Sequence, residues 1–168
     1  GRILIQSENE KQTGDIELLL QDDGVRLRIL VPVIGSRIWE LRANDSQILM
    51  YDYRDQSSSL HENSLEIREE FLGIDVKLSE IQELLQQPTK VSFLEVVKRD
   101  EDQRAIELVK RDNVLGDRIN VEINKWQEGE AGLFPQKMKL EDLFTGNKII
   151  LVFRARQEII GEPIVFEE

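Results

Sequence analysis

The chain has 168 residues, of which 40% are hydrophobic and 33% are charged, with a formal net charge of -11 and a pI near 4.7. This length and balance are typical of one globular domain with a substantial core, so we expect a single domain over residues 1–168. The negative charge excludes the basic surface that nucleic acid requires, the lack of cysteine excludes disulfides and thiolate metal sites, and no apolar run is long enough to span a bilayer.

Alternating hydrophobic and polar residues dominate the first third of the chain. This period of two predicts a strand over residues 16–21 and another over residues 25–31, each with one buried face. Asp23-Gly24 lies between them and predicts a tight hairpin turn, because Gly accepts a positive φ. Strands are likewise predicted over residues 36–43 and 47–53, joined by a short polar turn. The close spacing of the turns indicates an antiparallel meander rather than alternating βαβ units.

Two amphipathic helices are predicted in the middle of the chain. The first covers residues 64–72 and has Gly73 as its left-handed terminator. The second is predicted to begin at Ser79, whose side chain caps it while Gln82 completes a capping box, and to end before Pro88. Because each helix has one apolar face, each must lie against an apolar surface.

Strands return after the second helix, at residues 91–99, 104–111, 119–123 and 134–140. A loop rich in Gly and Glu is expected at residues 128–132, and a long closing strand at residues 147–158. These elements predict an α+β fold that is mainly β: a curved antiparallel half-barrel with helices covering its concave face. A sandwich is the alternative architecture.

Residues that carry chemistry are few. The single histidine, His61, lies in the polar stretch 57–63, which predicts a solvated loop histidine rather than a base or ligand. The acidic pairs match no calcium loop and are expected to be solvated charge: they are Asp22/Asp23, Glu69/Glu70 and Asp100/Asp102. No glycine-rich phosphate loop occurs. We therefore expect no enzymatic activity, no catalytic residue, no metal and no cofactor. A cluster of buried polar residues that converge inside the concave face would be needed to support an enzymatic function instead.

The most informative feature is an apolar turn at residues 31–35, with the sequence Val-Pro-Val-Ile-Gly. Pro32 removes a backbone donor and Gly35 permits a tight turn, so Val33 and Ile34 are candidates for an exposed tip. Exposed branched apolar residues on a loop indicate a contact site. The alternative is that both side chains fold back over the mouth of the half-barrel as an edge of its core.

Three stretches carry a resemblance to a known family. Residues 26–41 (RLRILVPVIGSRIWEL) run a strand into an apolar turn and then into a second strand. Residues 71–78 (FLGIDVKL) precede the second helix, and residues 134–140 (FPQKMKL) precede the closing strand. In this order they resemble the LolB family of outer membrane lipoprotein receptors, whose turn carries one Leu where this chain has Val33-Ile34.

The resemblance implies an incomplete barrel of the LolA/LolB type that encloses an apolar cavity for lipoprotein acyl chains. It implies a place in the bacterial envelope, at the periplasmic face of the outer membrane. It also implies a LolA-like carrier as a partner and a role for Val33 and Ile34 in placing lipoproteins into the membrane. A lipid anchor is implied as well, so we expect that residues 1–168 are a trimmed mature segment whose signal peptide and acylated cysteine have been removed.

Acyl chains or another lipid need no catalytic group, because each buried CH₂ contributes about 0.8 kcal/mol. We expect the ligand to contact residues that face inward from the strands and the lid: Leu18, Leu27, Ile29, Leu41, Ile81, Leu84, Leu85, Val121, Leu151 and Phe153. The alternative is that these residues are core only. The protein would then be a non-catalytic envelope scaffold or interaction module with a filled half-barrel, and a cavity would separate the two hypotheses.

Overall fold

The structure is a computed structural model that describes residues 1–30, 37–112, 114, 116–157 and 164–166. In chain order the strands are β1 (Arg2–Gln6), β2 (Lys11–Gln21), β3 (Gly24–Leu30), β4 (Arg37–Ala43), β5 (Gln47–Asp52), β6 (Ser57–Glu62), β7 (Glu95–Arg99), β8 (Ala105–Asp112), β9 (Gly116–Ile123), β10 (Trp126–Gly129), β11 (Gly132–Pro135), β12 (Lys137–Asp142) and β13 (Lys148–Val152). The two helices are α1 (Leu65–Leu72) and α2 (Leu78–Gln86).

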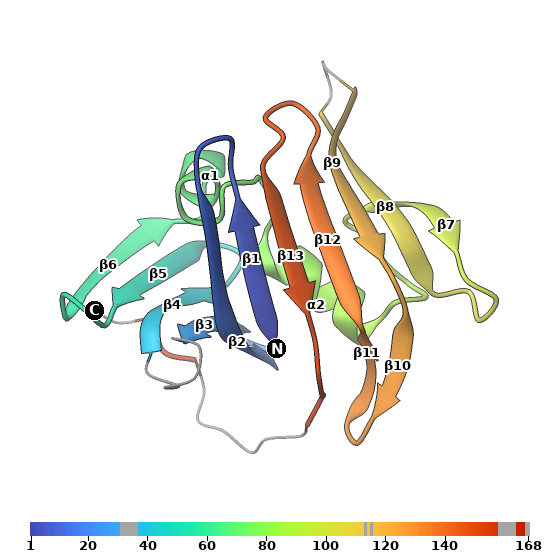
Figure 1. The fold of residues 1–168 in the computed structure, drawn as a ribbon, viewed down its shortest axis with the longest axis horizontal. Coiled ribbons are helices and arrows are strands. Elements are labelled where there is room, and N and C mark those ends of the chain that lie inside the picture. The colour runs from blue at the N-terminus through green and yellow to red at the C-terminus, as the bar shows by residue number, and fades with distance from the viewer. Residues whose placement is uncertain (31–36, 113, 115, 158–163, 167–168) are drawn as a thin grey trace.

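One large antiparallel sheet contains eleven of these strands, in the order β6-β5-β4-β3-β2-β1-β13-β12-β9-β8-β7. The sheet is curved but open, because its edge strands β6 and β7 are not paired with each other. β10 and β11 form a separate hairpin. The helices lie against one face of the sheet (Figure 1), and this confirms the predicted open half-barrel, mainly β, with helices covering one face.

Side-chain alternation along the strands builds the core between the sheet and the helices. Leu41 and Ala43 of β4 face the helices, as does Val121 of β9, and all three are buried. From the helix side, Ile81 and Leu84 of α2 join the same cluster. Apolar residues at every second strand position and on one face of α2 therefore meet in a single core, as their spacing requires.

β2 is the longest strand, and its two halves have different partners. Lys11 to Asp15 pair with β1, whereas Asp15 to Gln21 pair with β3. The turn into β3 consists of Asp22 and Asp23, and Gly24 is already the first residue of β3. The hairpin prediction was correct, but its reason was wrong: Gly24 lacks a positive φ, and a Cβ there would lie 2.7 Å from the Ala43 carbonyl oxygen.

The first predicted helix is confirmed, with the Ser64 side chain accepting from the Ile67 backbone N–H and Gly73 at a φ of 76°. The predicted cap of the second helix is wrong. α2 begins one residue earlier, and its N-cap is Lys77, whose backbone N–H donates to the Glu80 carboxylate at 2.9 Å. Ser79 is therefore inside the helix. Glu80 completes the capping box because it is the third helical residue after the N-cap Lys77.

Four predicted boundaries also differ from the structure. Residues 57–63 were predicted as a loop, but residues 57–62 form edge strand β6, which is too polar to show a hydrophobic alternation. Residues 128–132 belong to the β10–β11 hairpin. The strand predicted at 91–99 is shorter, because only β7 pairs with β8. The closing strand predicted at 147–158 ends at Val152, which pairs with the first residues of both β1 and β12.

The open edge at β7 is irregular. Its pairing with β8 shifts register between Val96 and Lys98 and again between Lys98 and Arg99. Glu95, Lys98 and Arg99 also place charges along this short strand. Val97 lies at the first shift and is 55% exposed.

A buried ion cluster supports the outer face of the sheet. Glu40 of β4 has no exposed surface and accepts hydrogen bonds at 2.5 Å from Arg28 of β3 and at 2.5 Å from Arg42 of β4. The Tyr53 hydroxyl lies 3.1 Å from the same carboxylate. Arg42 also donates to the Val165 carbonyl at 2.8 Å, which holds the described C-terminal segment to this face. Burial opposes ionisation of Glu40, but the hydrogen bonds from Arg28 and Arg42 outweigh it and lower the Glu40 pKa.

Replacing Glu40 with Gln removes the one negative charge between Arg28 and Arg42. We expect the free energy of unfolding to fall by about 3 kcal/mol at neutral pH, because Arg42 loses its counter-charge and Arg28 keeps only the more distant, exposed Glu17. Since the Glu40 pKa is lowered by folding, this contribution is complete above its ordinary pKa and is lost as the pH falls through the folded value. Denaturant unfolding of both proteins across acidic pH measures it, and a difference that stays constant down to the acid transition would contradict this account.

Candidate functional site

A cavity of about 840 Å³ opens beside the second half of β2. Its walls come from β2, β3, the end of α2, the β10–β11 hairpin and the segment that follows β13. Its apolar lining residues are Ile16, Leu18, Leu19, Leu20, Leu85, Ala131, Leu133, Phe134, Phe153 and Ala155. Its polar lining residues are Glu17, Arg26, Arg28, Gln86, Arg156 and Gln157, and Gly1 completes the lining.

The cavity lies beside the part of β2 that pairs with β3. Gly1 lies next to Ile16: its nitrogen donates to the Ile16 carbonyl at 3.0 Å, and its carbonyl accepts from the Ile16 N–H at 2.9 Å. β2 continues for five residues past Ile16, to Gln21, with β3 on its other side. The space beside that continuation is the cavity.

Arg156 holds the opposite wall in place. Its Nη1 donates to the Leu85 carbonyl at 3.2 Å and to the Leu133 carbonyl at 2.8 Å, so it joins the end of α2 to β11. Its own carbonyl accepts from the Ala131 N–H at 3.3 Å. Phe153 is fixed by a backbone bond of 3.1 Å from its N–H to the Gln136 carbonyl. The backbone that carries the aromatic and aliphatic side chains of this wall is therefore fixed by hydrogen bonds.

All ten predicted ligand residues belong to the hydrophobic core or pack against it, but only some of them line the cavity. Leu18, Leu85 and Phe153 line the cavity. The other seven are buried in the core cluster around it: Leu27, Ile29, Leu41, Ile81, Leu84, Val121 and Leu151. The binding role of all ten stays a prediction. Val33 and Ile34, predicted as a contact loop, lie outside the described residues.

Several cavity residues were missed by sequence reasoning. Leu133 and Phe134 belong to β11, which was expected in part as a loop, and Arg156 was expected inside a long closing strand. The signal that could have located the hairpin is its glycine pair, Gly129 and Gly132, since Gly132 has a φ of 123° and closes the turn.

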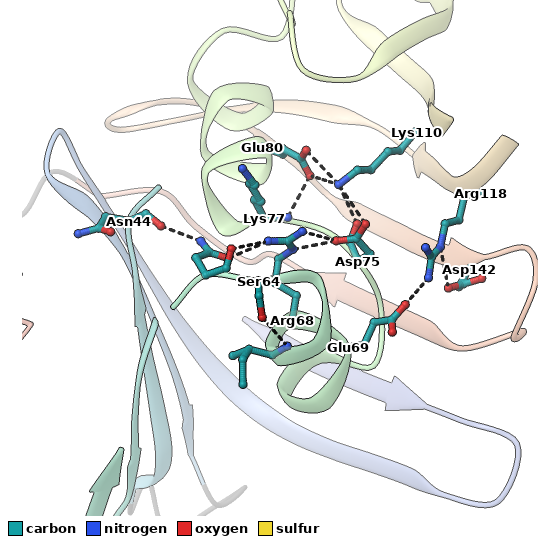
Figure 2. A network of polar contacts seen from close by, with 12 residues as sticks. Asn44, Ser64, Arg68, Glu69, Asp75, Lys77, Glu80, Lys110, Arg118 and Asp142 are labelled. Atoms are coloured by element: carbon teal, nitrogen blue, oxygen red, sulfur yellow. Dashed lines mark hydrogen bonds and ion pairs between the residues drawn. The ribbon is translucent and has the colours of Figure 1, made fainter. Parts of the chain in front are cut away.

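A network of charges fastens the helices to the sheet (Figure 2). Arg68 of α1 donates to the Asp75 carboxylate, with Nε at 2.8 Å. Lys110 of β8 reaches the Asp75 carbonyl at 3.0 Å and the Glu80 carboxylate at 3.3 Å. Arg68, Asp75 and Glu80 are all buried. Asp75, in the linker, is thus bound to α1 by Arg68 and to β8 by Lys110, and Lys110 also binds Glu80 of α2.

The network continues at both ends of α1. Arg68 also donates to the Asn63 carbonyl at 2.9 Å, and the Asn63 side chain donates to the Asn44 carbonyl at 2.7 Å, which ties α1 to the β4–β5 turn. On the other side, Arg118 of β9 pairs with Glu69 of α1 and lies 3.8 Å from the Asp142 carboxylate (Figure 2). Polar bonds therefore fix α1 and the linker. α2 is also anchored by polar bonds, since Gln82 donates to the Gln21 carbonyl at 2.7 Å, while its Leu85 side chain lines the cavity.

The single histidine of the chain packs against α1. Contrary to the loop prediction, His61 lies in β6, where its Nε2 is 2.9 Å from the Ser59 hydroxyl and its ring packs edge-on against Phe71. Among the described residues no group of three or more His, Cys, Asp or Glu could hold a metal ion. None of the described helices has the length and apolar character needed to cross a membrane.

Comparisons with known proteins identify the relatives of this architecture. A family model described as outer membrane lipoprotein LolB matches residues 1–155. A solved domain named for outer membrane lipoprotein sorting, from Vibrio parahaemolyticus, superposes with a TM-score of 0.56 and 9% identity over 90% of this chain and 80% of that one. A DUF1329 family protein from Desulfovibrio piger superposes with a TM-score of 0.54 and 11% identity over 89% and 79%. These two structures share the fold. No curated protein matches the chain.

The anchoring network predicts unequal effects for two chemically identical substitutions. Asp75→Asn leaves Arg68 and Lys110 without their shared carboxylate, so we expect the free energy of unfolding to fall by about 3 kcal/mol. Asp102→Asn is the matched control, because Asp102 is 73% exposed although it pairs with Arg104 at 2.6 Å. That loss should stay below about 1 kcal/mol. Denaturant unfolding measures both, and equal losses would show that burial of the network adds nothing.

Proposed function

Because this chain belongs to the LolB family of outer membrane lipoproteins, which acts in lipoprotein localisation in the bacterial envelope, we propose that it holds lipoprotein acyl chains in its cavity and helps deliver them to the outer membrane. We propose no catalytic step. The chain acts as a binding domain formed by residues 1–168 as one unit.

The observation that supports this proposal is the cavity of about 840 Å³, whose lining combines leucine and phenylalanine side chains with charged and amide side chains. Pockets for small ligands usually have about 300–1,000 Å³, so the volume suits a ligand of that class. Hydrocarbon in such a pocket is stabilised by about 0.8 kcal/mol for each CH₂ removed from water. A filled half-barrel, as in the scaffold hypothesis, would offer no such space.

The polar groups around the cavity fit a ligand that is held by apolar contact. Arg156 is engaged with two backbone carbonyls, and Arg28 is engaged with Glu40 and lies 3.6 Å from Glu17. These cations are neutralised or hydrogen-bonded by the protein itself, so they do not force an anionic ligand. The apolar side chains between them supply the binding energy.

Transfer requires only a difference in affinity. A receptor that accepts an acyl chain from a carrier and releases it to a membrane must bind the chain more tightly than the carrier and less tightly than the bilayer. We propose that a LolA-like carrier is the donor and that a lipid anchor ahead of residue 1 keeps the domain at the periplasmic face of the outer membrane. Val33 and Ile34 are proposed to contact the membrane during release.

A charge introduced into the cavity should abolish the proposed binding. We expect Phe153→Glu to weaken binding of a fluorescent fatty-acid probe at least tenfold, about 1.4 kcal/mol, because a carboxylate would line an apolar wall. Val152→Glu is the matched control, since Val152 is the neighbouring residue, is 36% exposed and does not line the cavity. Probe titration measures both, after thermal unfolding shows that both variants are folded.

The unmodified protein sets the standard for this experiment. Native mass spectrometry should find about one acyl ligand bound per chain, and a fatty acid should displace the probe. If the wild-type protein binds no probe where a known lipid carrier does, the cavity hypothesis fails and the interaction module becomes the better hypothesis. Should Phe153→Glu not fold, Leu133→Glu on the partly exposed β11 takes its place.

A substitution in the apolar turn separates binding from delivery. We expect Ile34→Glu to bind the fatty-acid probe as the wild type does and to slow transfer of a bound lipopeptide into phospholipid vesicles about tenfold, because a charged tip enters the membrane interface poorly. Transfer is followed by loss of lipopeptide from the protein. Equal transfer rates for the variant and the wild type would remove the turn from the delivery step.

A further inference from the structure

We propose that Arg156 is a positioning residue that fixes the width of the cavity, so that the cavity selects straight hydrocarbon chains over branched ones. This inference rests on the proposed function and deepens it, because it concerns which acyl chains the same cavity accepts. Arg156 lies just beyond residues 1–155, the part of the chain that matches the family model.

The cavity wall that faces β2 consists of three segments with no common sheet. They are the end of α2, the β10–β11 hairpin and residues 153–157, and they contribute Leu85, Leu133 and Ala155 to the lining. The hairpin is separate from the eleven-stranded sheet. No strand ladder therefore sets the distance between α2 and the hairpin, and other contacts must set it.

The hairpin is fixed to the sheet at its base but depends on Arg156 farther out. At the base, the ring N–H of the buried Trp126 donates to the Ala105 carbonyl at 2.9 Å, which joins the hairpin to β8. The Arg156 carbonyl accepts from the Ala131 N–H at 3.3 Å, and its Nη1 donates to the Leu133 carbonyl at 2.8 Å. Among the described residues, these are the hydrogen bonds that join the outer part of the hairpin to the rest of the chain.

The nitrogen that holds the hairpin also holds the helix. Nη1 of Arg156 donates to the Leu85 carbonyl at 3.2 Å as well as to the Leu133 carbonyl. Leu85 lies in the last turn of α2, where the helix end carries a partial negative charge and where α2 has no basic residue of its own. One cation therefore sets the separation between two walls of the cavity, with Leu85 on one and Leu133 on the other.

The hairpin leaves room for Arg156 at its two glycines. A Cβ at Gly132 would lie 3.6 Å from Nη1, so the guanidinium group packs directly over this glycine. A Cβ at Gly129 would lie 3.4 Å from the Arg156 carbonyl oxygen and 2.9 Å from Cε1 of the Phe134 ring. The backbone and the side chain of Arg156 therefore both fit closely against the hairpin.

A wall that is fixed in this way discriminates between ligands by shape. A straight chain occupies the cavity with the Arg156 hydrogen bonds intact, whereas a methyl-branched chain needs more width and has to move the helix end away from the hairpin. That movement breaks charge-assisted hydrogen bonds and leaves the Leu85 and Leu133 carbonyls without their donor, which is unfavourable. Binding surfaces that can repack are less selective.

The affinities of the full chain for two fatty acids test this selection. The probes are palmitate, which is straight, and phytanate, which has a main chain of the same length with methyl branches. We expect the wild-type protein to bind palmitate about tenfold more tightly than phytanate. Arg156→Met keeps an unbranched side chain and removes both hydrogen bonds of Nη1, so we expect this ratio to fall to about one.

Two variants separate the hydrogen bonds from the loss of charge and from a general structural effect. Arg154→Met is the matched control, because Arg154 is exposed and does not line the cavity, and we expect it to keep the wild-type ratio. Arg156→Lys is the conservative variant. Because both bonds come from one nitrogen, an ammonium group can replace it, and we expect a palmitate preference of about threefold or more to return.

The separation of the two walls can also be measured without a ligand. The chain has no cysteine, so Gln87→Cys and Glu130→Cys, at exposed positions beside the end of α2 and at the hairpin tip, can carry spin labels. We expect electron paramagnetic resonance to give a narrow distribution of label distances, and Arg156→Met to broaden it. A distribution that Arg156→Met leaves unchanged would overturn the proposal.

The binding results distinguish this inference from the proposed function. If Arg156→Met keeps the wild-type ratio, or weakens both fatty acids to the same extent, Arg156 has only a structural role and the inference is overturned while the proposed function stands. The same holds if the wild-type protein binds both fatty acids equally. If the wild-type protein binds neither, the inference and the proposed function both fail.

Discussion

The fold depends on one long strand that belongs to two differently paired parts of the sheet. β2 pairs with β1 through its first half and with β3 through its second half, so the strands β3–β6 join the rest of the sheet through it. The second half of β2 also lines the cavity, so one strand both joins the two parts of the sheet and forms a wall of the candidate site.

The two helices are held by different sets of polar contacts. Buried charges around Asp75 fix α1 and the linker, and these contacts are directional and depend on every partner being present. α2 is joined to β2 by Gln82, which donates to the Gln21 carbonyl at 2.7 Å, and its end is joined to β11 by Arg156. Both helices are therefore fixed by directional bonds as well as by the apolar core between them and the sheet.

The sequence predicted the strands and helices of the fold better than it predicted the residues that line the cavity. Alternation located β2, β3, β4, β5 and β9, because half-buried strands show it directly, and Ser64 and Gly73 marked the ends of α1 correctly. β6 was missed because its stability comes from pairing with β5. The far cavity wall was missed because Leu133 and Arg156 become neighbours only through a turn and a strand end that local pattern does not reveal. The family resemblance was confirmed, while the ligand residues remain a prediction.

The irregular edge at β7 has a consequence for life at high density. An open sheet ends in two strands that another copy of the protein could extend, and an incomplete barrel keeps both ends available. The two register shifts of β7 interrupt the regular row of backbone donors and acceptors with which a strand of another copy would pair, and the charges of β7 oppose such pairing further. At high protein concentration, the β7 edge of this open sheet is therefore a poor site for pairing with a strand of another copy.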